Sequence, residues 1–347
     1  MLTVEQESSP LIEINGNTNL RVVAFAANGE YLVSGGRGGV RVWRVEDGKR
    51  MATMEVNRVE CLAVSKDGRW IAAGTYDGDV IVWDTKTCET AFSHKGKYIY
   101  GDINGVDFSP DSTELVSASD SGTVSIWDIA TRKRVQILDH QNLVVAVKYS
   151  PQDDRIATAS IDSVRVWGSN DGCLLVNITV TVTPWRNTGL LWFNNHLFVI
   201  SDRKIKQFEA STGSAVSEWP LPDSNSSSCI ALPNKGEVIA YSTQRAVTFW
   251  DTATHTQRGL IQHPQDIHSI AVSPDDLFLA IGGREGKITI NSISHIIVSI
   301  LSRCIVVHMN NFLAPIIFPS DSIPLSHIHP TFLEPDIRID NATLHSW

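Results

Sequence analysis

Positive charge is scarce in this sequence. Its 347 residues include 29 lysines and arginines against 38 aspartates and glutamates, which gives a formal net charge of −9. Proteins that neutralise the phosphates of DNA or RNA carry the opposite excess. We therefore do not expect nucleic-acid binding to be the main function of this chain.

Paired cysteines and a secretory signal are also lacking. The five cysteines stand singly, with no CxxC pair, and residues 1–10 contain no apolar stretch. A disulfide framework requires pairs of cysteines, and a signal peptide requires an apolar segment. We expect free thiols, most of them in the core, in an intracellular protein that is cytoplasmic or nuclear.

The third absence is an uninterrupted apolar run of membrane length. Residues 295–318 are strongly apolar, but Arg303, His308 and two asparagines interrupt them. A transmembrane helix needs about 20 largely apolar residues, so membrane association is not expected. We interpret residues 292–347 as an irregular or disordered tail. A translated intron is one alternative, and the truncated start of a helical region, capped near residues 334–340, is another.

One pattern runs through residues 11–291. A tryptophan, or a residue in its place, ends a short apolar run about every 41 residues. Seven such positions occur, at Trp43, Trp83, Trp127, Trp167, Phe208, Trp250 and Asn291. A fixed period of this length indicates seven copies of one supersecondary unit.

Each repeat has the parts of a four-stranded sheet. An alternating run such as residues 104–108 leads into a Ser-Pro-Asp turn, and a second run ends in small residues, as at 115–119. The run that ends in tryptophan is the third, and a more polar fourth run follows it. Short strands separated by turns at regular spacing predict an all-β array.

Three of the third runs end in Trp-Asp, at residues 83–84, 127–128 and 250–251. These dipeptides and the period resemble WD repeats, and the resemblance implies a seven-bladed β-propeller of four-stranded blades around a central channel. The seventh repeat ends without a fourth strand, whereas residues 11–14 form a spare strand before the first repeat. We expect this N-terminal strand to close the ring.

The resemblance also implies a hydrogen-bonded chain of His, Ser or Thr, Asp and Trp inside each blade. The fourth repeat fits best, with His140, either Thr158 or Ser160, Asp162 and Trp167. His140, Ser160 and Asp162 superficially resemble a hydrolase triad, but we expect them to satisfy buried hydrogen bonds. The other expected members are Asp77, Trp83, Asp120, Trp127 and Asp202.

Catalytic and metal-binding patterns are weak. The glycines of residues 35–39 precede a strand rather than a helix, which suits a turn and not a phosphate-binding loop. His327 and His329 have no cysteine or carboxylate cluster beside them. We therefore predict no enzymatic activity, no cofactor, no metal ion and no small-molecule substrate.

The family resemblance implies that other proteins or peptides bind to the loops around the channel mouth. We expect the residues before the Asp-type turn position to point toward that face: Tyr76, Ser119, Ile161, Ser201, Thr243 and Arg284. Aromatic and arginine side chains dominate interface energetics, which adds Tyr98, Tyr100, Trp185 and Arg186 as candidates. Tyr98 and Trp185 equally suit the blade core.

The leading hypothesis is thus a non-catalytic scaffold that binds another protein or peptide. An enzyme or small-molecule binder would instead gather titratable residues at the channel mouth. An RNA- or chromatin-associated assembly factor would carry a basic stripe across one face.

Overall fold

A computed structural model describes residues 9–96, 101–152, 154–182, 189–221 and 229–297. The chain divides into two units, residues 1–301 and 302–347. Residues 298–347 lie outside the described residues, and with them most of the predicted tail and both His327 and His329. Within the described ranges, no helix is long and apolar enough to cross a membrane.

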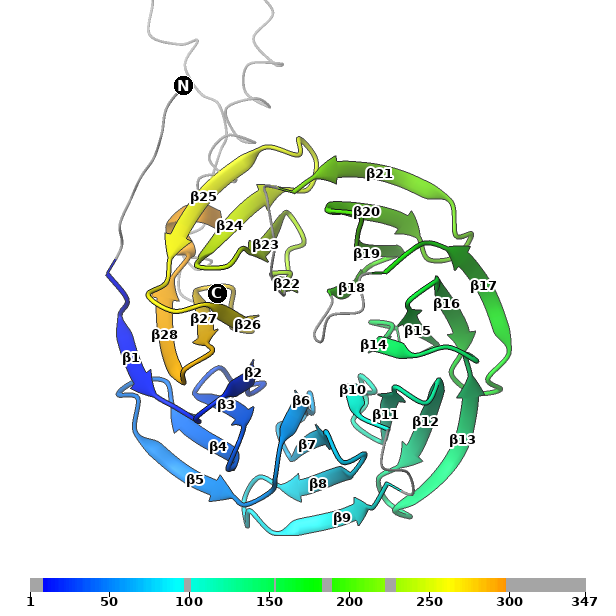
Figure 1. Ribbon diagram of the computed structural model, residues 1–347, viewed down its shortest axis with the longest axis horizontal. Helices are drawn as coiled ribbons and strands as arrows, with labels where there is room; N and C mark the ends of the chain where they lie inside the picture. The colour runs from blue at the N-terminus through cyan, green and yellow to red at the C-terminus, as the bar shows by residue number, and fades with distance from the viewer. Residues whose placement is uncertain (1–8, 97–100, 153, 183–188, 222–228, 298–347) are drawn as a thin grey trace, which may run out of the picture. The chain divides into compact units, whose positions relative to one another are not determined.

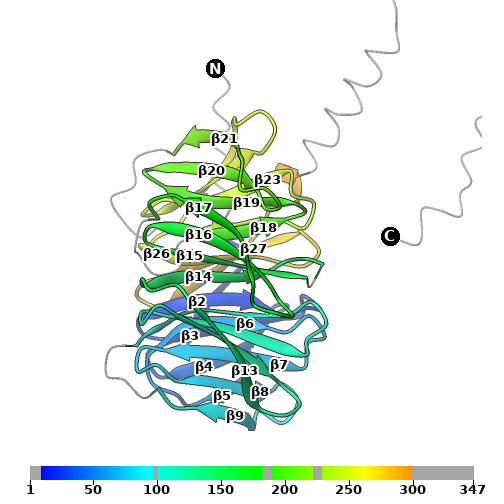
Figure 2. The ribbon, with the colours of Figure 1, turned by 90° about the vertical axis from the view of Figure 1, so that its right-hand side faces the viewer.

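The described part of the first unit is a closed ring of seven antiparallel sheets, each with four strands (Figure 1). The predicted seven-bladed β-propeller is confirmed. The strands run between the two faces of the ring, so that the turns gather on these faces (Figure 2). Beyond the last strand, a single helical turn covers residues 294–297.

In the first four blades the strands follow the chain order from the channel outward (Figure 1). Blade one contains β2 (Leu20–Phe25), β3 (Tyr31–Gly36), β4 (Gly39–Arg44) and β5 (Arg50–Met54). Blade two contains β6 (Val59–Val64), β7 (Trp70–Thr75), β8 (Val80–Asp84) and β9 (Thr90–His94). Blade three contains β10 (Ile103–Phe108), β11 (Glu114–Ser119), β12 (Thr123–Asp128) and β13 (Lys133–Asp139). Blade four contains β14 (Val144–Tyr149), β15 (Arg155–Ser160), β16 (Ser163–Gly168) and β17 (Leu174–Thr179).

The remaining three blades follow the same order. Blade five contains β18 (Leu190–Phe193), β19 (His196–Ser201), β20 (Lys204–Glu209) and β21 (Ala215–Pro220). Blade six contains β22 (Ile230–Ala231), β23 (Val238–Ser242), β24 (Ala246–Asp251) and β25 (Gln257–Gln262). Blade seven contains β26 (Ile267–Val272), β27 (Phe278–Gly283), β28 (Lys287–Ser292) and, as its outer strand, β1 (Ile12–Asn15).

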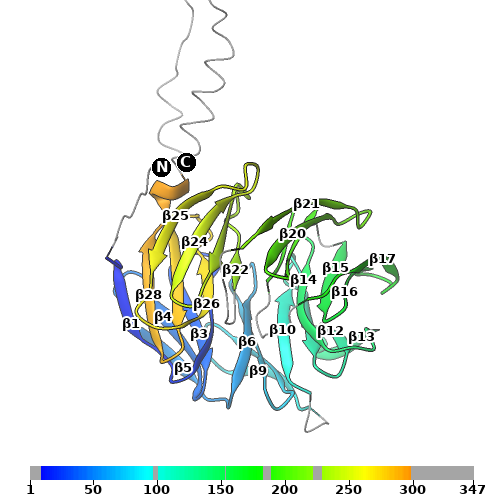
Figure 3. The ribbon, with the colours of Figure 1, turned by 45° about the horizontal axis from the view of Figure 1, so that its top comes forward.

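The N-terminal strand closes the ring, as the sequence predicts. β1 pairs antiparallel with β28, with Ile12 opposite Ile290 and Ile14 opposite Ile288. Figure 3 shows β1 along the outer side of β28. Blade seven is therefore completed by a segment that precedes blade one in the chain, and this pairing leaves β28 with no free edge.

The repeated tryptophans form the contacts between neighbouring blades. Trp43 of blade one lies in a core cluster with Ile14 and Ile288 of blade seven. Trp127 likewise packs with the core of blade two, and Trp167 with that of blade three. The period in the sequence thus reflects one packing position that recurs at each boundary between blades.

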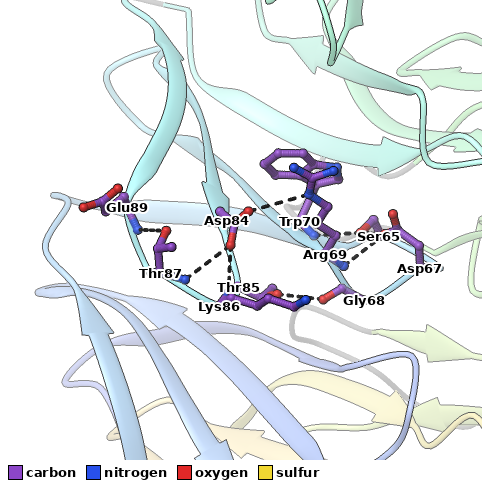
Figure 4. A network of polar contacts seen from close by, with 10 residues as sticks. All are labelled: Ser65, Asp67, Gly68, Arg69, Trp70, Asp84, Thr85, Lys86, Thr87 and Glu89. Atoms are coloured by element: carbon purple, nitrogen blue, oxygen red, sulfur yellow. Dashed lines mark hydrogen bonds and ion pairs between the residues drawn. The ribbon is translucent and has the colours of Figure 1, made fainter.

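The aspartate of the Trp-Asp dipeptide holds the next turn in place. Asp84 Oδ1 accepts hydrogen bonds from the backbone N–H groups of Lys86 and Thr87, at 2.9 and 3.2 Å (Figure 4). Asp251 accepts in the same way from Ala253 and Thr254. These bonds explain the dipeptide, since a short carboxylate at this position satisfies the turn between the third and fourth strands.

The first residues of the predicted tail pack against the propeller. Ile293, Ile296 and Ile297 are buried in a cluster with residues of blades six and seven. A Cβ at Gly259 of β25 would approach Ile296 to 3.1 Å, which is closer than ordinary contact. Ile293, Ile296 and Ile297 therefore belong to the apolar core of the ring.

Candidate protein-binding surface

One face of the ring carries the turns between the second and third strands and the loops that enter the inner strands. Backbone bonds join each turn to its loop in three blades: Tyr76 N–H to Arg58 O (2.9 Å), Asp120 N–H to Asp102 O (3.0 Å) and Arg284 N–H to Asp266 O (2.8 Å). We call this the loop face. Because strands and backbone bonds fix its turns, side chains there are presented without new folding.

Three of the predicted partner-binding residues present side chains on the loop face. Tyr76 is half-buried, and the guanidinium carbon of Arg58 lies 3.3 Å from the centre of its ring. Arg284 is exposed, and Ile161 is an apolar side chain with 36% exposure. The guanidinium group of Arg58 and the ring of Tyr76 therefore make a cation–π contact on this face.

Three other candidates lie in the same turns without presenting much side chain. Ser119 and Ser201 are buried. Thr243 is half-buried, and its hydroxyl donates to Ala246 O over 3.0 Å within its own turn. The remaining candidates lie outside the described residues: Tyr98, Tyr100, Trp185 and Arg186.

The face also contains arginines that sequence reasoning did not single out as contacts. Arg37 and Arg58 are exposed on blades one and two, and Arg284 is exposed on blade seven. Exposed acids, among them Asp77 and Glu285, lie in the same turns. Charges of both signs are thus interspersed across the described part of this face, which does not match the basic stripe of an RNA-binding surface.

The polar chain of blade four runs through Thr158. Its hydroxyl accepts the indole N–H of Trp167 at 2.8 Å and lies 2.5 Å from His140 Nε2. Burial, followed by the charge of Arg165, lowers the pKa of His140 to about 4. Ser160 donates instead to Asp162 over 2.6 Å and is fully buried. A nucleophile that is buried and paired with the carboxylate cannot attack a substrate, so these residues do not form a hydrolase triad.

Blade one holds a similar chain that the sequence did not reveal. Trp43 donates to Ser34 over 2.8 Å, and Ser34 donates to Asn17 Oδ1 over 2.7 Å. Asn17, which is fully buried, takes the place that His140 has in blade four. It follows β1, so the loop that closes the ring also supplies a buried bond to blade one.

The other expected blade residues have varied partners. Asp120 accepts from the side chain of Asn104, and Asp202 accepts from Ser201 and from Lys206. Asp77 is exposed, and Trp83 is buried in the core between blades one and two. His263 contacts the backbone of Gln265, and burial lowers its pKa.

The channel mouth on the opposite face is a pocket of about 590 Å³. Its lining is mostly apolar or consists of Ser-Pro turns, and its charged side chains are Lys66, Asp107 and Asp276. Asp107 already accepts from Tyr149 N–H, and Asp276 from Asn234 N–H. Both carboxylates thus serve the fold, and this mouth does not favour catalysis. Within the described ranges, no three metal-ligating side chains converge.

Comparison with known proteins agrees with this geometry. Residues 21–196 match the family model described as nucleolar protein 10-like, N-terminal domain, and residues 254–290 match the WD domain, G-beta repeat. The chain belongs to the WD-repeat β-propeller family. The first match runs from blade one into blade five, and the second covers the outer strand of blade six and the inner strands of blade seven. The outer strand of blade seven, β1, precedes both matches.

Individual relatives share parts of this WD-repeat propeller. Cilia- and flagella-associated protein 52 of Macaca fascicularis is 34% identical over 126 residues, which are 32% of this chain and 21% of that protein. Periodic tryptophan protein 2 of Arabidopsis thaliana is 30% identical over 161 residues, 44% of this chain and 18% of that protein. The chain spans about a fifth of the length of these curated relatives.

Proposed function

We propose that this WD-repeat propeller is a non-catalytic scaffold that binds a partner protein through its loop face. The observation that carries the proposal is the stack of Arg58 on Tyr76 (3.3 Å). We group it with the exposed Arg37 and Arg284 of the adjacent blades as one patch over blades seven, one and two. Tyrosine and arginine side chains contribute strongly to binding at interfaces, and a tyrosine ring loses little conformational entropy when it binds.

Charge supports a protein partner over a nucleic acid. The whole chain has a net charge of −9, and exposed acids share the turns of the patch. A partner segment with acidic and apolar side chains would complement the exposed guanidinium groups and the ring of Tyr76.

A pull-down with cross-linking would test the loop face. We expect the triple variant Tyr76→Ala, Arg58→Ala and Arg284→Ala to lose most of the partners that the wild-type chain retains. The matched control is Lys66→Ala with Arg132→Ala, because these changes remove charge from the opposite face. Equal recovery of every partner by both variants and the wild type would argue against the loop face.

We further propose a nuclear location. The support is the match of residues 21–196 to the nucleolar protein 10-like domain, together with the similarity to periodic tryptophan protein 2. Imaging of the tagged chain tests this, and a signal confined to the cytoplasm or to cilia would contradict it.

A further inference from the structure

A pocket of about 340 Å³ opens on the loop face between blades two and three. Its lining includes hydroxyl side chains of the second and third strands of blade three: Ser117, Ser119, Thr123 and Ser125. Trp127 and Arg134 complete this side of the pocket.

The corresponding space in blades one and four is filled by the chain itself. In blade four, His140 enters from the loop and contacts Thr158. Arg165 lies opposite Thr158 on the next strand and donates to Asp139 O at 3.3 Å. In blade one, Asn17 and Arg41 take these two places, and Arg41 donates to Gly16 O at 2.7 Å.

Blade three has the same pair of a tryptophan and a hydroxyl. Trp127 donates to Ser117 over 2.9 Å, as Trp43 donates to Ser34 and Trp167 to Thr158. The residue opposite Ser117 is Ser125, where the other two blades have an arginine. Serine is much smaller than arginine, and the pocket lies where the arginine side chain stands in blades one and four.

The polar groups of the lining are hydroxyls, His94 and Arg134, and two of the hydroxyls already donate within the chain, Ser119 to Gly101 O and Ser121 to Ser119. The Ser117 hydroxyl accepts from Trp127, so its own O–H remains available. Arg134 is exposed, and its guanidinium group lies 5.9 Å from the ring centre of Trp127. Of the neighbouring acids, Asp79 accepts from Gly96 N–H and Asp120 accepts from the Asn104 side chain. The described lining contains no carboxylate.

We infer that this pocket binds an oxyanion, namely a phosphate monoester carried on a side chain of the bound partner. Several hydroxyl donors and one guanidinium group suit the three acceptor oxygens of a phosphate better than the two of a carboxylate. The inference that a bound partner carries the phosphate rests on the proposed function, whereas the inference of an oxyanion site does not.

Calorimetric titration of the full chain with inorganic phosphate, at constant ionic strength, tests the site. We expect a dissociation constant on the order of 1 mM for the free ion, and no heat from acetate at equal concentration. Ser125→Leu fills the pocket without adding a charge or a hydrogen-bond donor and should weaken phosphate binding at least about tenfold. Thr53→Leu is the matched control, because Thr53 is exposed on the outer strand of blade one. No heat with the wild type, or equal heat with Ser125→Leu, overturns the site.

Two further arms separate the sources of the phosphate. O-phosphoserine should bind more tightly than inorganic phosphate if the group arrives on a side chain, and weaker binding would overturn that part. Partner recovery by Ser125→Leu distinguishes this inference from the proposed function. If the variant loses phosphate binding but recovers the same partners, the scaffold and the oxyanion site stand, and the inference that the partner carries the phosphate is overturned. If the variant loses both phosphate and partners, that inference is supported.

Discussion

Trp167 and Thr158 share the central hydrogen bond of blade four, which spans 2.8 Å from the indole N–H to the hydroxyl oxygen. The same oxygen contacts His140 Nε2, and the hydroxyl donates to Arg165 O at 3.4 Å. If His140 carries its proton on Nε2, the Thr158 hydroxyl accepts from both rings and donates to Arg165 O, and the buried His140 Nδ1 is an unpaired acceptor. One hydroxyl thus joins two strands and a loop.

Replacing Thr158 with valine keeps the shape of the side chain and removes this junction. The indole N–H and the imidazole would each lose a buried partner, which costs about 1–3 kcal/mol per group. We expect the free energy of unfolding in urea to fall by roughly 2–4 kcal/mol. Thr53→Val, at an exposed site, should change it by less than about 0.5 kcal/mol. A loss no larger than that of the control would show that the junction is not stabilising.

His140 makes the stability of the propeller depend on pH. Its pKa is lowered to about 4 in the folded chain, from the usual 6.5. The unfolded chain binds more protons between these values, so stability is complete above pH 6.5 and falls as the pH drops through this window. The loss due to His140 is about 2 kcal/mol at pH 5 and approaches about 3 kcal/mol near pH 4.

The variant His140→Asn isolates this contribution, because Asn17 fills the same place in blade one. We expect its unfolding free energy, measured in urea from pH 7.5 to 5, to decline less steeply than that of the wild type. Burial also lowers the pKa values of His263 and His268, so the variant keeps part of the slope. Identical slopes for the two proteins would contradict the assignment.

The sequence predicts the ring well because the repeat reports packing. Trp127 and its equivalents in other repeats stand where each blade packs against the preceding one. The unpaired strand at residues 11–14 can pair only with the seventh repeat, which lacks a fourth strand. The filling of each blade is less predictable. Asn17 replaces the expected histidine in a loop of different length, and no spacing rule identifies it. The contact of Arg58 with Tyr76 could not be predicted from the sequence either, because it depends on how two loops lie relative to each other.

The described cysteines should differ sharply in reactivity. Cys173 is exposed, whereas Cys61 and Cys229 are buried. Burial raises the pKa of Cys229 to about 12 and that of Cys61 still further. Thiolates are the reactive form, so iodoacetamide at pH 8 should label Cys173 first and the two buried thiols only after unfolding. Peptide mass spectrometry of a time course checks the order, and early labelling of Cys61 would contradict its burial between blades two and three.

Ring closure offers the last test. Ile14 is 3% exposed and packs with Trp43 and Ile288, so it joins the outer strand of blade seven to blade one. Ile14→Ala should lower the free energy of unfolding by about 2–4 kcal/mol. Glu13→Ala, on the exposed side of the same strand, should cost less than about 1 kcal/mol, since it removes only the surface ion pair with Lys287.

Removing residues 2–16 should lower the free energy of unfolding further, because β28 would become a free edge that can pair with other chains. Size-exclusion chromatography should then show concentration-dependent association. A shortened chain that stays monomeric, with unchanged stability, would mean that β1 does not close the ring in solution.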